Sequence, residues 1–244
     1  MLNLLGIVSK SSNVGMALIA ERVGNAELHG IIRRFGFGEL TQVGFPGENA
    51  GLVYPLQSWT SYSATSVSFG YEVSVTPLQL ATGFSAIVNH GLLLRPRLVR
   101  ALLGPDGRIV ESFDAPLVVR RALSTEVAAY VADEVLVAVV ESPGGGGRRA
   151  RTRDYTVLGK TGTAKLPYAD RSGYEPGAYL STFVGVAPAT DPQVVALVMV
   201  RRPNPTLGYY GGVVSAPAVG RILQATLAYL EVLPEKVCPW RGGQ

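Results

Sequence analysis

Apolar residues recur at helical spacing in several windows of this 244-residue chain. After Ser12 or Asn13, either of which can cap a helix, apolar side chains fall on one face as far as about Val23. A later window begins with Thr76-Pro77, a threonine N-cap followed by proline at the first helical position, which is typical of a helix start. We expect helices over residues 12–23, 25–35, 77–90, 124–140 and 217–230.

The pattern changes to strands in the second half of the chain. Apolar segments of strand length, separated by turn-rich segments, predict an antiparallel meander over residues 155–164, 179–187 and 193–201. A separate hairpin is predicted over residues 98–103 and 108–113, with Pro105-Asp106-Gly107 as its turn.

Together these elements predict one α+β unit, and the chain is long enough to bury a full core. Residues 1–150 are expected to be mostly helical and rich in loops, and residues 151–244 to form antiparallel strands plus a C-terminal helix. Residues 38–75 are rich in Gly, Pro, Ser and Thr. A loop of that length within a compact domain is usually functional.

Charge and composition exclude several classes of function. The net charge is +4, and the tightest basic group is Arg148, Arg149, Arg151 and Arg153. Binding of nucleic acid would require a basic stripe with interleaved aromatic residues, so a solvated loop that faces an acidic surface is the preferred interpretation. His29 and His90 lack ligand spacing, and we expect neither a metal site nor a cofactor.

The sequence contains no apolar run long enough to span a membrane and no secretory signal. The longest strand-like apolar run, Val194 to Val200, has the length of a buried strand. Cys238 is the single cysteine, so the chain cannot form an internal disulfide.

The segment Gly159 to Ala164, which reads Gly-Lys-Thr-Gly-Thr-Ala, invites two chemical interpretations. A phosphate-binding loop would need glycine at position 154, where the chain has Asp154, and a glycine-rich turn where residues 155–158 are typical of a strand. The phosphate-loop interpretation therefore fails. Lys-Thr-Gly at the edge of a strand is also a motif of serine transpeptidases and serine β-lactamases, which transfer acyl groups.

In an acyl-transfer site, Lys160 would supply a cation for a substrate carboxylate, and Thr161 could bond the same carboxylate. Gly162 would let the substrate backbone approach closely, and the N–H of Thr163 would point at the oxyanion. Strand alternation puts Lys160 and Thr161 on opposite faces, so both serve one site only on a twisted edge strand. On its own, the motif could be merely a polar strand end.

Ser11-Ser12-Asn13 is the second candidate motif, 147 residues before Lys160. The Ser11 hydroxyl could relay a proton between Lys160 and a leaving amine, and the Asn13 amide could both donate to and accept from a peptide. Taken alone, the motif could be no more than a helix cap. The two motifs support each other because both fit the same site.

The chain resembles the C-terminal part of the transpeptidase domain of class B penicillin-binding proteins. The shared segments, besides the two motifs, are Phe35 to Gly38, Gly44 to Glu48, Ser68 to Tyr71 and Val75 to Ala81. Single shared residues follow: Tyr179, Phe183, Val184, Gly185 and Pro188, then Gly211-Gly212 with Ala216-Pro217. By this resemblance Ser11, Asn13 and Lys160 are expected to be catalytic, and Ser12, Thr161, Gly162 and Thr163 to bind substrate. Glu72 stands where the resemblance leads us to expect a small residue.

The resemblance implies the penicilloyl-serine transferase fold, an antiparallel sheet with flanking helices and a helical subdomain. It implies a D,D-transpeptidase that cross-links peptidoglycan stem peptides through a serine acyl-enzyme and that β-lactam antibiotics trap. The full-length parent would work on the extracytoplasmic (periplasmic) face of the bacterial inner membrane, with divisome or elongasome membrane proteins as partners.

One motif of the family is missing from this sequence. No serine has a lysine three residues later, so the Ser-x-x-Lys nucleophile motif is absent. We therefore expect an N-terminally truncated domain whose start at Met1 is a fragment boundary, and whether the chain itself is an enzyme stays open. The alternative is a non-catalytic remnant that binds peptides or divisome proteins. A β-lactamase is disfavoured because nothing resembles a deacylating glutamate site.

Overall fold

The computed structural model describes residues 2–236, and Cys238 lies outside them. By contacts the chain divides into unit 1, residues 1–16 with 129–244, and unit 2, residues 17–128. The division at residue 150 expected from the sequence separates a helical, loop-rich part from a part of antiparallel strands. This division stays a prediction. By contacts, the helical residues that follow 128 group with the strands. In the described part of the chain, no helix combines the length and apolar character needed to cross a membrane.

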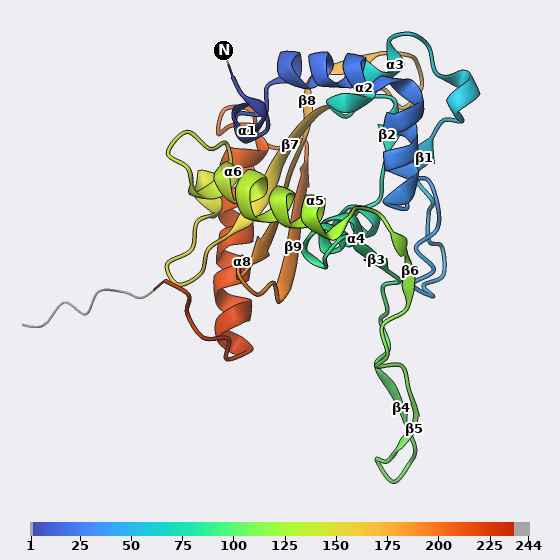
Figure 1. The fold of residues 1–244 in the computed structure, drawn as a ribbon, viewed down its shortest axis with the longest axis vertical. Coiled ribbons are helices and arrows are strands. Elements are labelled where there is room, and N and C mark those ends of the chain that lie inside the picture. The colour runs from blue at the N-terminus through green and yellow to red at the C-terminus, as the bar shows by residue number, and fades with distance from the viewer. Residues whose placement is uncertain (1, 237–244) are drawn as a thin grey trace, which may run out of the picture. The chain divides into compact units, whose positions relative to one another are not determined.

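Unit 1 contains a three-stranded sheet with helices packed against it. Its elements are α1 (Leu4–Ser9), η2 (Val131–Leu136), α6 (Val137–Glu141), η3 (Arg148–Ala150), β7 (Leu158–Pro167), β8 (Tyr174–Ala187), β9 (Val194–Arg201), α7 (Gly211–Val214) and α8 (Ala216–Tyr229). The strands are antiparallel in the order β7-β8-β9, which confirms the predicted meander. Figure 1 shows α8 running along the sheet, as its contacts with β8 and β9 require.

The core of unit 1 lies between the sheet and α8. Phe183 of β8 is fully buried, as are Val219 and Leu223 of α8. A Cβ at Gly185 of β8 would lie 2.7 Å from Val219, so helix and strand approach more closely than a side chain there would allow. This packing holds β8 in place, and β8 pairs with β7 along the whole Lys-Thr-Gly segment.

Unit 2 consists of short helices, short strands and loops. Its elements are β1 (Leu52–Val53), η1 (Leu56–Ser58), α3 (Ser63–Ser68), β2 (Val73–Ser74), α4 (Pro77–Val88), β3 (Leu92–Leu94), β4 (Ala101–Leu103), β5 (Ile109–Ser112) and β6 (Val118–Arg121). The β4–β5 pair is the predicted hairpin, and it projects from the rest of its unit (Figure 1). The expected Thr76 cap is present as a capping box with Gln79.

Two helices cross the boundaries of the units. Residues Asn13–Arg34 form α2, in which Gly24 has a φ of 79° and breaks the helix, so the two helices predicted over 12–23 and 25–35 are confirmed. The helix predicted over 124–140 is also confirmed. It consists of α5 (Thr125–Tyr130), the π-helical stretch η2 and α6.

The segment 38–75 is anchored, although the sequence suggests a plain loop. It contains β1, η1, α3 and β2. The buried amide of Gln79 donates to the carbonyls of Glu39 and Ala50, which ties the segment to α4. Glu72 has a φ of 57°, in the left-handed region that favours glycine, which explains why a small residue is expected there. Its carboxylate accepts a hydrogen bond from the Ser63 hydroxyl.

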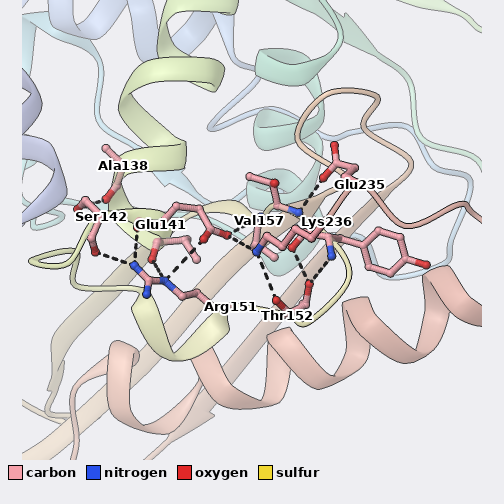
Figure 2. A network of polar contacts seen from close by, with 11 residues as sticks. Ala138, Glu141, Ser142, Arg151, Thr152, Val157, Glu235 and Lys236 are labelled. Carbon is pink, nitrogen blue, oxygen red and sulfur yellow. Dashed lines mark hydrogen bonds and ion pairs between the residues drawn. The ribbon is translucent and has the colours of Figure 1, made fainter. Parts of the chain in front are cut away.

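A polar network fixes the start of β7 (Figure 2). One carboxylate oxygen of Glu141 accepts from the backbone N–H of Val157 at 3.1 Å and from Lys236 Nζ at 3.1 Å. The other lies 3.6 Å from Arg151 Nε. Glu235 accepts from the N–H of Thr156 at 2.7 Å. Two carboxylates thus hold consecutive N–H groups just before the strand that carries Lys160.

Replacing Glu141 by alanine should lower the free energy of unfolding by about 1–3 kcal/mol, because the N–H of the fully buried Val157 loses its acceptor. Glu141→Gln keeps an acceptor oxygen and should cost clearly less. Urea denaturation of both variants checks this. Equal losses in the two variants would show that the carboxylate charge, not the bond to Val157, stabilises this corner.

Candidate active site

The two motifs meet within unit 1. Lys160 Nζ donates to Ser11 Oγ at 2.8 Å, across 149 positions of sequence. Ser11 lies in the turn between α1 and α2 with a φ of 53°, a conformation that is rare outside glycine and is common at functional sites. The structure thus brings Ser11 and Lys160 together, and their catalytic roles stay predictions.

Lys160 is half-buried, and no carboxylate in the described part of the chain pairs with it. Its other contacts are the carbonyl of Thr161 at 3.0 Å and the Thr161 hydroxyl at 3.4 Å. Burial lowers the pKa of Lys160 from 10.5 to about 8, because desolvation penalises the ammonium. Near neutral pH the Lys160 side chain is cationic and can attract an anion. Because its pKa lies only slightly above that pH, it can also release its proton readily.

This pKa predicts a pH dependence of stability. Between about 8 and 10.5 the unfolded chain holds a proton on Lys160 that the folded chain has released, so the free energy of unfolding should rise with pH across that window. Below this window both states are protonated, and the penalty of burying the ammonium is constant. Lys160→Met should remove the rise and stabilise the fold at neutral pH.

Urea denaturation at a series of pH values measures this effect as the difference between the variant and the parent chain. Lys165→Met, which removes an exposed lysine from the same strand, is the matched control and should leave the rise intact. A parent chain whose pH profile matches that of Lys160→Met would show that Lys160 is not desolvated.

The side chains of Thr161 and Lys160 leave β7 on opposite faces, yet Lys160 Nζ comes within hydrogen-bonding distance of the Thr161 hydroxyl. Lys160 pairs with Val184 and Thr161 with Phe183, so the two side chains leave opposite sides of the sheet, as alternation requires. In the described sheet β7 is an edge strand, paired with β8 alone. The lysine side chain can therefore bend toward the open edge, where Nζ meets the Thr161 carbonyl and hydroxyl.

Ser12 and Asn13 take different places at the start of α2. The Ser12 hydroxyl accepts from the N–H of Gly15 at 3.2 Å, which is helix capping. Asn13 is exposed, and its side chain has no hydrogen bond to another described residue, which leaves its amide available to a ligand. Substrate binding by Ser12 and catalysis by Asn13 stay predictions.

Gly162 and Thr163 continue the edge strand, opposite Thr182 and Ser181 of β8. The Thr163 hydroxyl accepts from the N–H of Gly211 at 3.0 Å, at the start of α7. A Cβ at Gly211 would lie 2.2 Å from the Thr182 carbonyl and 2.5 Å from that of Gly162. The backbone at Gly211 thus lies directly against the Lys-Thr-Gly strand. The sequence pattern includes Gly211 but gives no reason for it.

The backbone of the glycine run 144–147 is hydrogen-bonded to distant residues. The N–H of Gly146 donates to the Ser9 carbonyl at 3.1 Å, and that of Gly147 to the Val139 carbonyl at 2.9 Å. A Cβ at Gly146 would lie 3.8 Å from the Thr161 hydroxyl oxygen. The run therefore borders the site, and four successive glycines were the available signal.

A stack of tyrosines lies at the Thr163 end of the strand. Tyr179 and Tyr209 stack with ring centroids 4.1 Å apart, and the Tyr210 ring is tilted by 30° against that of Tyr209, with centroids 4.3 Å apart. The Tyr209 hydroxyl donates to that of Tyr210, and this bond is the main cause that raises the pKa of Tyr209 to about 12. Sequence reasoning missed this stack as part of the site because nothing in the pattern joins Tyr179 to Tyr209.

The described residues contain no cluster of His, Cys, Asp and Glu that could hold a metal ion. The geometry brings together a lysine of lowered pKa, a serine hydroxyl, threonine hydroxyls and an open strand edge. These are the parts of a site that binds an anionic acyl substrate along a strand.

The family model of the penicillin binding protein transpeptidase domain matches residues 1–224. The chain therefore belongs to the transpeptidase domain family of penicillin-binding proteins, which confirms the resemblance and the penicilloyl-serine transferase fold. Over 97% of its length it is 36% identical to a probable peptidoglycan D,D-transpeptidase, PbpC, from Pseudomonas aeruginosa. The chain covers 39% of that protein, and 31% and 35% of two further curated relatives.

Solved structures agree with this assignment. Penicillin-binding protein 3 from Mycobacterium tuberculosis superposes with a TM-score of 0.85 at 31% identity, over 96% of this chain and 53% of that one. The same protein has been solved in complex with aztreonam and with ampicillin. The transpeptidase domain of penicillin-binding protein 3 from Burkholderia pseudomallei gives a TM-score of 0.83 at 33% identity, over 96% of this chain and 66% of that one.

Proposed function

We propose that this chain supplies the substrate-binding side of a peptidoglycan D,D-transpeptidase site. The observation that carries the proposal is the 2.8 Å contact between Lys160 Nζ and Ser11 Oγ, which joins the two motifs. The stem peptide would lie along the edge of β7, with its carboxylate near Lys160 and Thr161. β-Lactams would bind in the same place; a related mycobacterial protein has been solved in complex with aztreonam and with ampicillin.

Each group has a role that its contacts support. The Ser11 hydroxyl accepts from Lys160 and keeps its own proton to donate, so it can pass a proton from the lysine to a leaving amine. The hydroxyl of Thr163 accepts from Gly211 and can still donate to a ligand. Along an edge strand alternate N–H groups point away from the sheet, and we assign the Thr163 N–H to the oxyanion.

The acyl-enzyme itself needs a serine nucleophile. None of the serines in these 244 residues is followed by lysine at the third position, so in a longer protein the nucleophile would come from residues outside this sequence. The absence of Ser-x-x-Lys also favours a second candidate. A chain with this site but without a nucleophile would bind stem peptides or divisome proteins without reacting.

We place a protein that carries this domain at the extracytoplasmic face of the bacterial inner membrane, where peptidoglycan precursors are cross-linked. Divisome or elongasome membrane proteins are its expected partners. The support for this assignment is family membership, together with relatives named as peptidoglycan transpeptidases.

Labelling with a fluorescent penicillin tests the proposal. Denaturing electrophoresis should show no covalent band, because the nucleophile is absent, whereas fluorescence anisotropy should show reversible binding. Lys160→Ala should weaken that binding about tenfold or more, since the carboxylate would lose the Lys160 cation. Lys165→Ala, on the same strand but exposed, is the control and should bind normally.

Two outcomes would contradict the account. A covalent band that Ser11→Ala abolishes would make Ser11 a nucleophile and overturn its role as a relay. Binding that is absent, or that Lys160→Ala does not change, would mean that the Lys-Thr-Gly strand is not the binding site of this chain.

A further inference from the structure

A groove rich in arginine lies on unit 1, apart from the residues of the candidate active site. It runs between the segment around η3 and residues 217–225 of α8 and encloses about 710 Å³. Four of the residues that line it are arginines: Arg149, Arg151, Arg153 and Arg221. No residue from the Ser11 or Lys160 motifs contributes to it.

The walls of the groove are built from closely packed backbone. A Cβ at Gly220 of α8 would lie 2.7 Å from the carbonyl of Ala150, so only glycine allows helix and η3 to approach this closely. Ala150 is fully buried beneath the contact. The positions of the arginines on either side are therefore set by the packed backbone beneath them and not by a free loop.

Two of the four arginines are already engaged. Arg151 donates to the carbonyls at the end of α6, including that of Val140 at 2.9 Å, and Arg153 pairs with Asp154 at 2.7 Å. Arg149 and Arg221 are exposed, and within residues 2–236 neither guanidinium has a hydrogen bond or an ion pair. One belongs to η3 and the other to α8, so each wall of the groove carries an uncompensated guanidinium.

The lining between these charges is largely apolar. Pro217 and Ala225 of α8 contribute to it, with the polar side chains of Thr152 and Gln224 beside them. No aromatic residue lines the groove, so it has no surface on which a nucleic-acid base could stack. An inorganic anion would leave the apolar lining exposed to water.

We propose that this groove binds an acidic peptide segment of a partner protein. Arg149 and Arg221 would each take a carboxylate, for which the guanidinium fork is well shaped. An apolar side chain between the two acidic residues would lie on Pro217 and Ala225. The charge of the groove and its apolar lining together select a peptide over a nucleic acid or a free phosphate.

The test uses the whole chain and a fluorescein-labelled peptide of alternating glutamate and leucine, followed by anisotropy. The double variant Arg149→Glu/Arg221→Glu should weaken binding about tenfold or more, because both carboxylates then meet like charge. Arg149→Lys/Arg221→Lys keeps the charge but loses the fork and should weaken it by a smaller factor. A peptide of alternating glutamine and leucine should not bind.

Arg22→Glu/Arg34→Glu is the matched control, since it makes the same change of net charge at exposed arginines of α2. It should change binding about twofold or less. Equal losses of peptide binding in the two double variants would show that overall charge alone causes the loss, and this result would overturn the proposal. Tighter binding to phosphatidylglycerol vesicles than to the peptide, or release of the peptide by equimolar inorganic phosphate, would overturn it as well.

Discussion

Phe183→Ala is expected to lower the free energy of unfolding by about 3–5 kcal/mol, the cost of emptying a well-packed aromatic site. The side chain is fully buried in β8. Glycines border its ring, since a Cβ at Gly147 or Gly159 would lie 2.8 Å or 2.9 Å from it. Backbone that is held this tightly cannot collapse into the space that the ring leaves, so the full cavity cost should appear.

Urea denaturation measures the loss directly. Tyr229→Ala is the matched control, because this tyrosine of α8 is 85% exposed and its removal should cost less than about 0.5 kcal/mol. A loss for Phe183→Ala as small as that of the control would show that the glycines around Phe183 do not enclose it.

Gly211→Ala should cost about 3 kcal/mol and should also disturb the candidate site. The added Cβ would stand 2.2 Å from the Thr182 carbonyl and 2.5 Å from the Gly162 carbonyl, and both are main-chain atoms that cannot rotate away. Either α7 or the Lys-Thr-Gly strand must move, and the bond from the Gly211 N–H to Thr163 is lost with it.

Gly144→Ala is the control for this substitution. A Cβ there would meet only Lys10, at 3.9 Å, so the change should stay within about 0.5 kcal/mol. Thermal unfolding compares the two variants, and anisotropy with fluorescent penicillin reports on the site. If Gly211→Ala were stable and still bound normally, α7 would not support the strand.

Local signals in the sequence were sufficient for most of the fold. The Thr76-Pro77 cap gives the start of α4, and Gly24 separates two helical patterns at the residue where the helix breaks. The three strands of the meander appear because each is an apolar run bounded by turn residues, although β8 begins at Tyr174, five residues before the predicted start. Capping and periodicity depend on neighbours a few residues away, which a sequence displays directly.

Elements fixed by distant contacts could not be predicted in the same way. Residues 38–75 fold into short pieces because Gln79 binds the carbonyls of Glu39 and Ala50, an arrangement with no periodic pattern. The glycine run beside Thr161 looks flexible in the sequence. It is hydrogen-bonded because the Ser9 carbonyl, far away in the chain, accepts the N–H of Gly146.

The sequence predicted which residues belong to the candidate site, but it predicted only part of their spatial arrangement. The two motifs identified Ser11 and Lys160, and the structure brings these side chains together. Alternation left open whether Lys160 and Thr161 could serve one site. The two residues can serve one site because β7 lies at the edge of the described sheet. The position of a strand in its sheet cannot be read from the alternation of its residues. The lowered pKa of Lys160 comes from burial, which no motif reports.

The most direct test of the central claim, that Lys160 and Ser11 act as one binding unit, is a double-mutant cycle. Ser11→Ala, Lys160→Met and the double variant would be titrated by calorimetry with a stem-peptide mimic ending in D-alanyl-D-alanine. The account predicts that the second substitution adds little to the first, with a coupling free energy of about 1 kcal/mol or more. Losses that simply add would show that the 2.8 Å contact has no part in binding and would contradict the account.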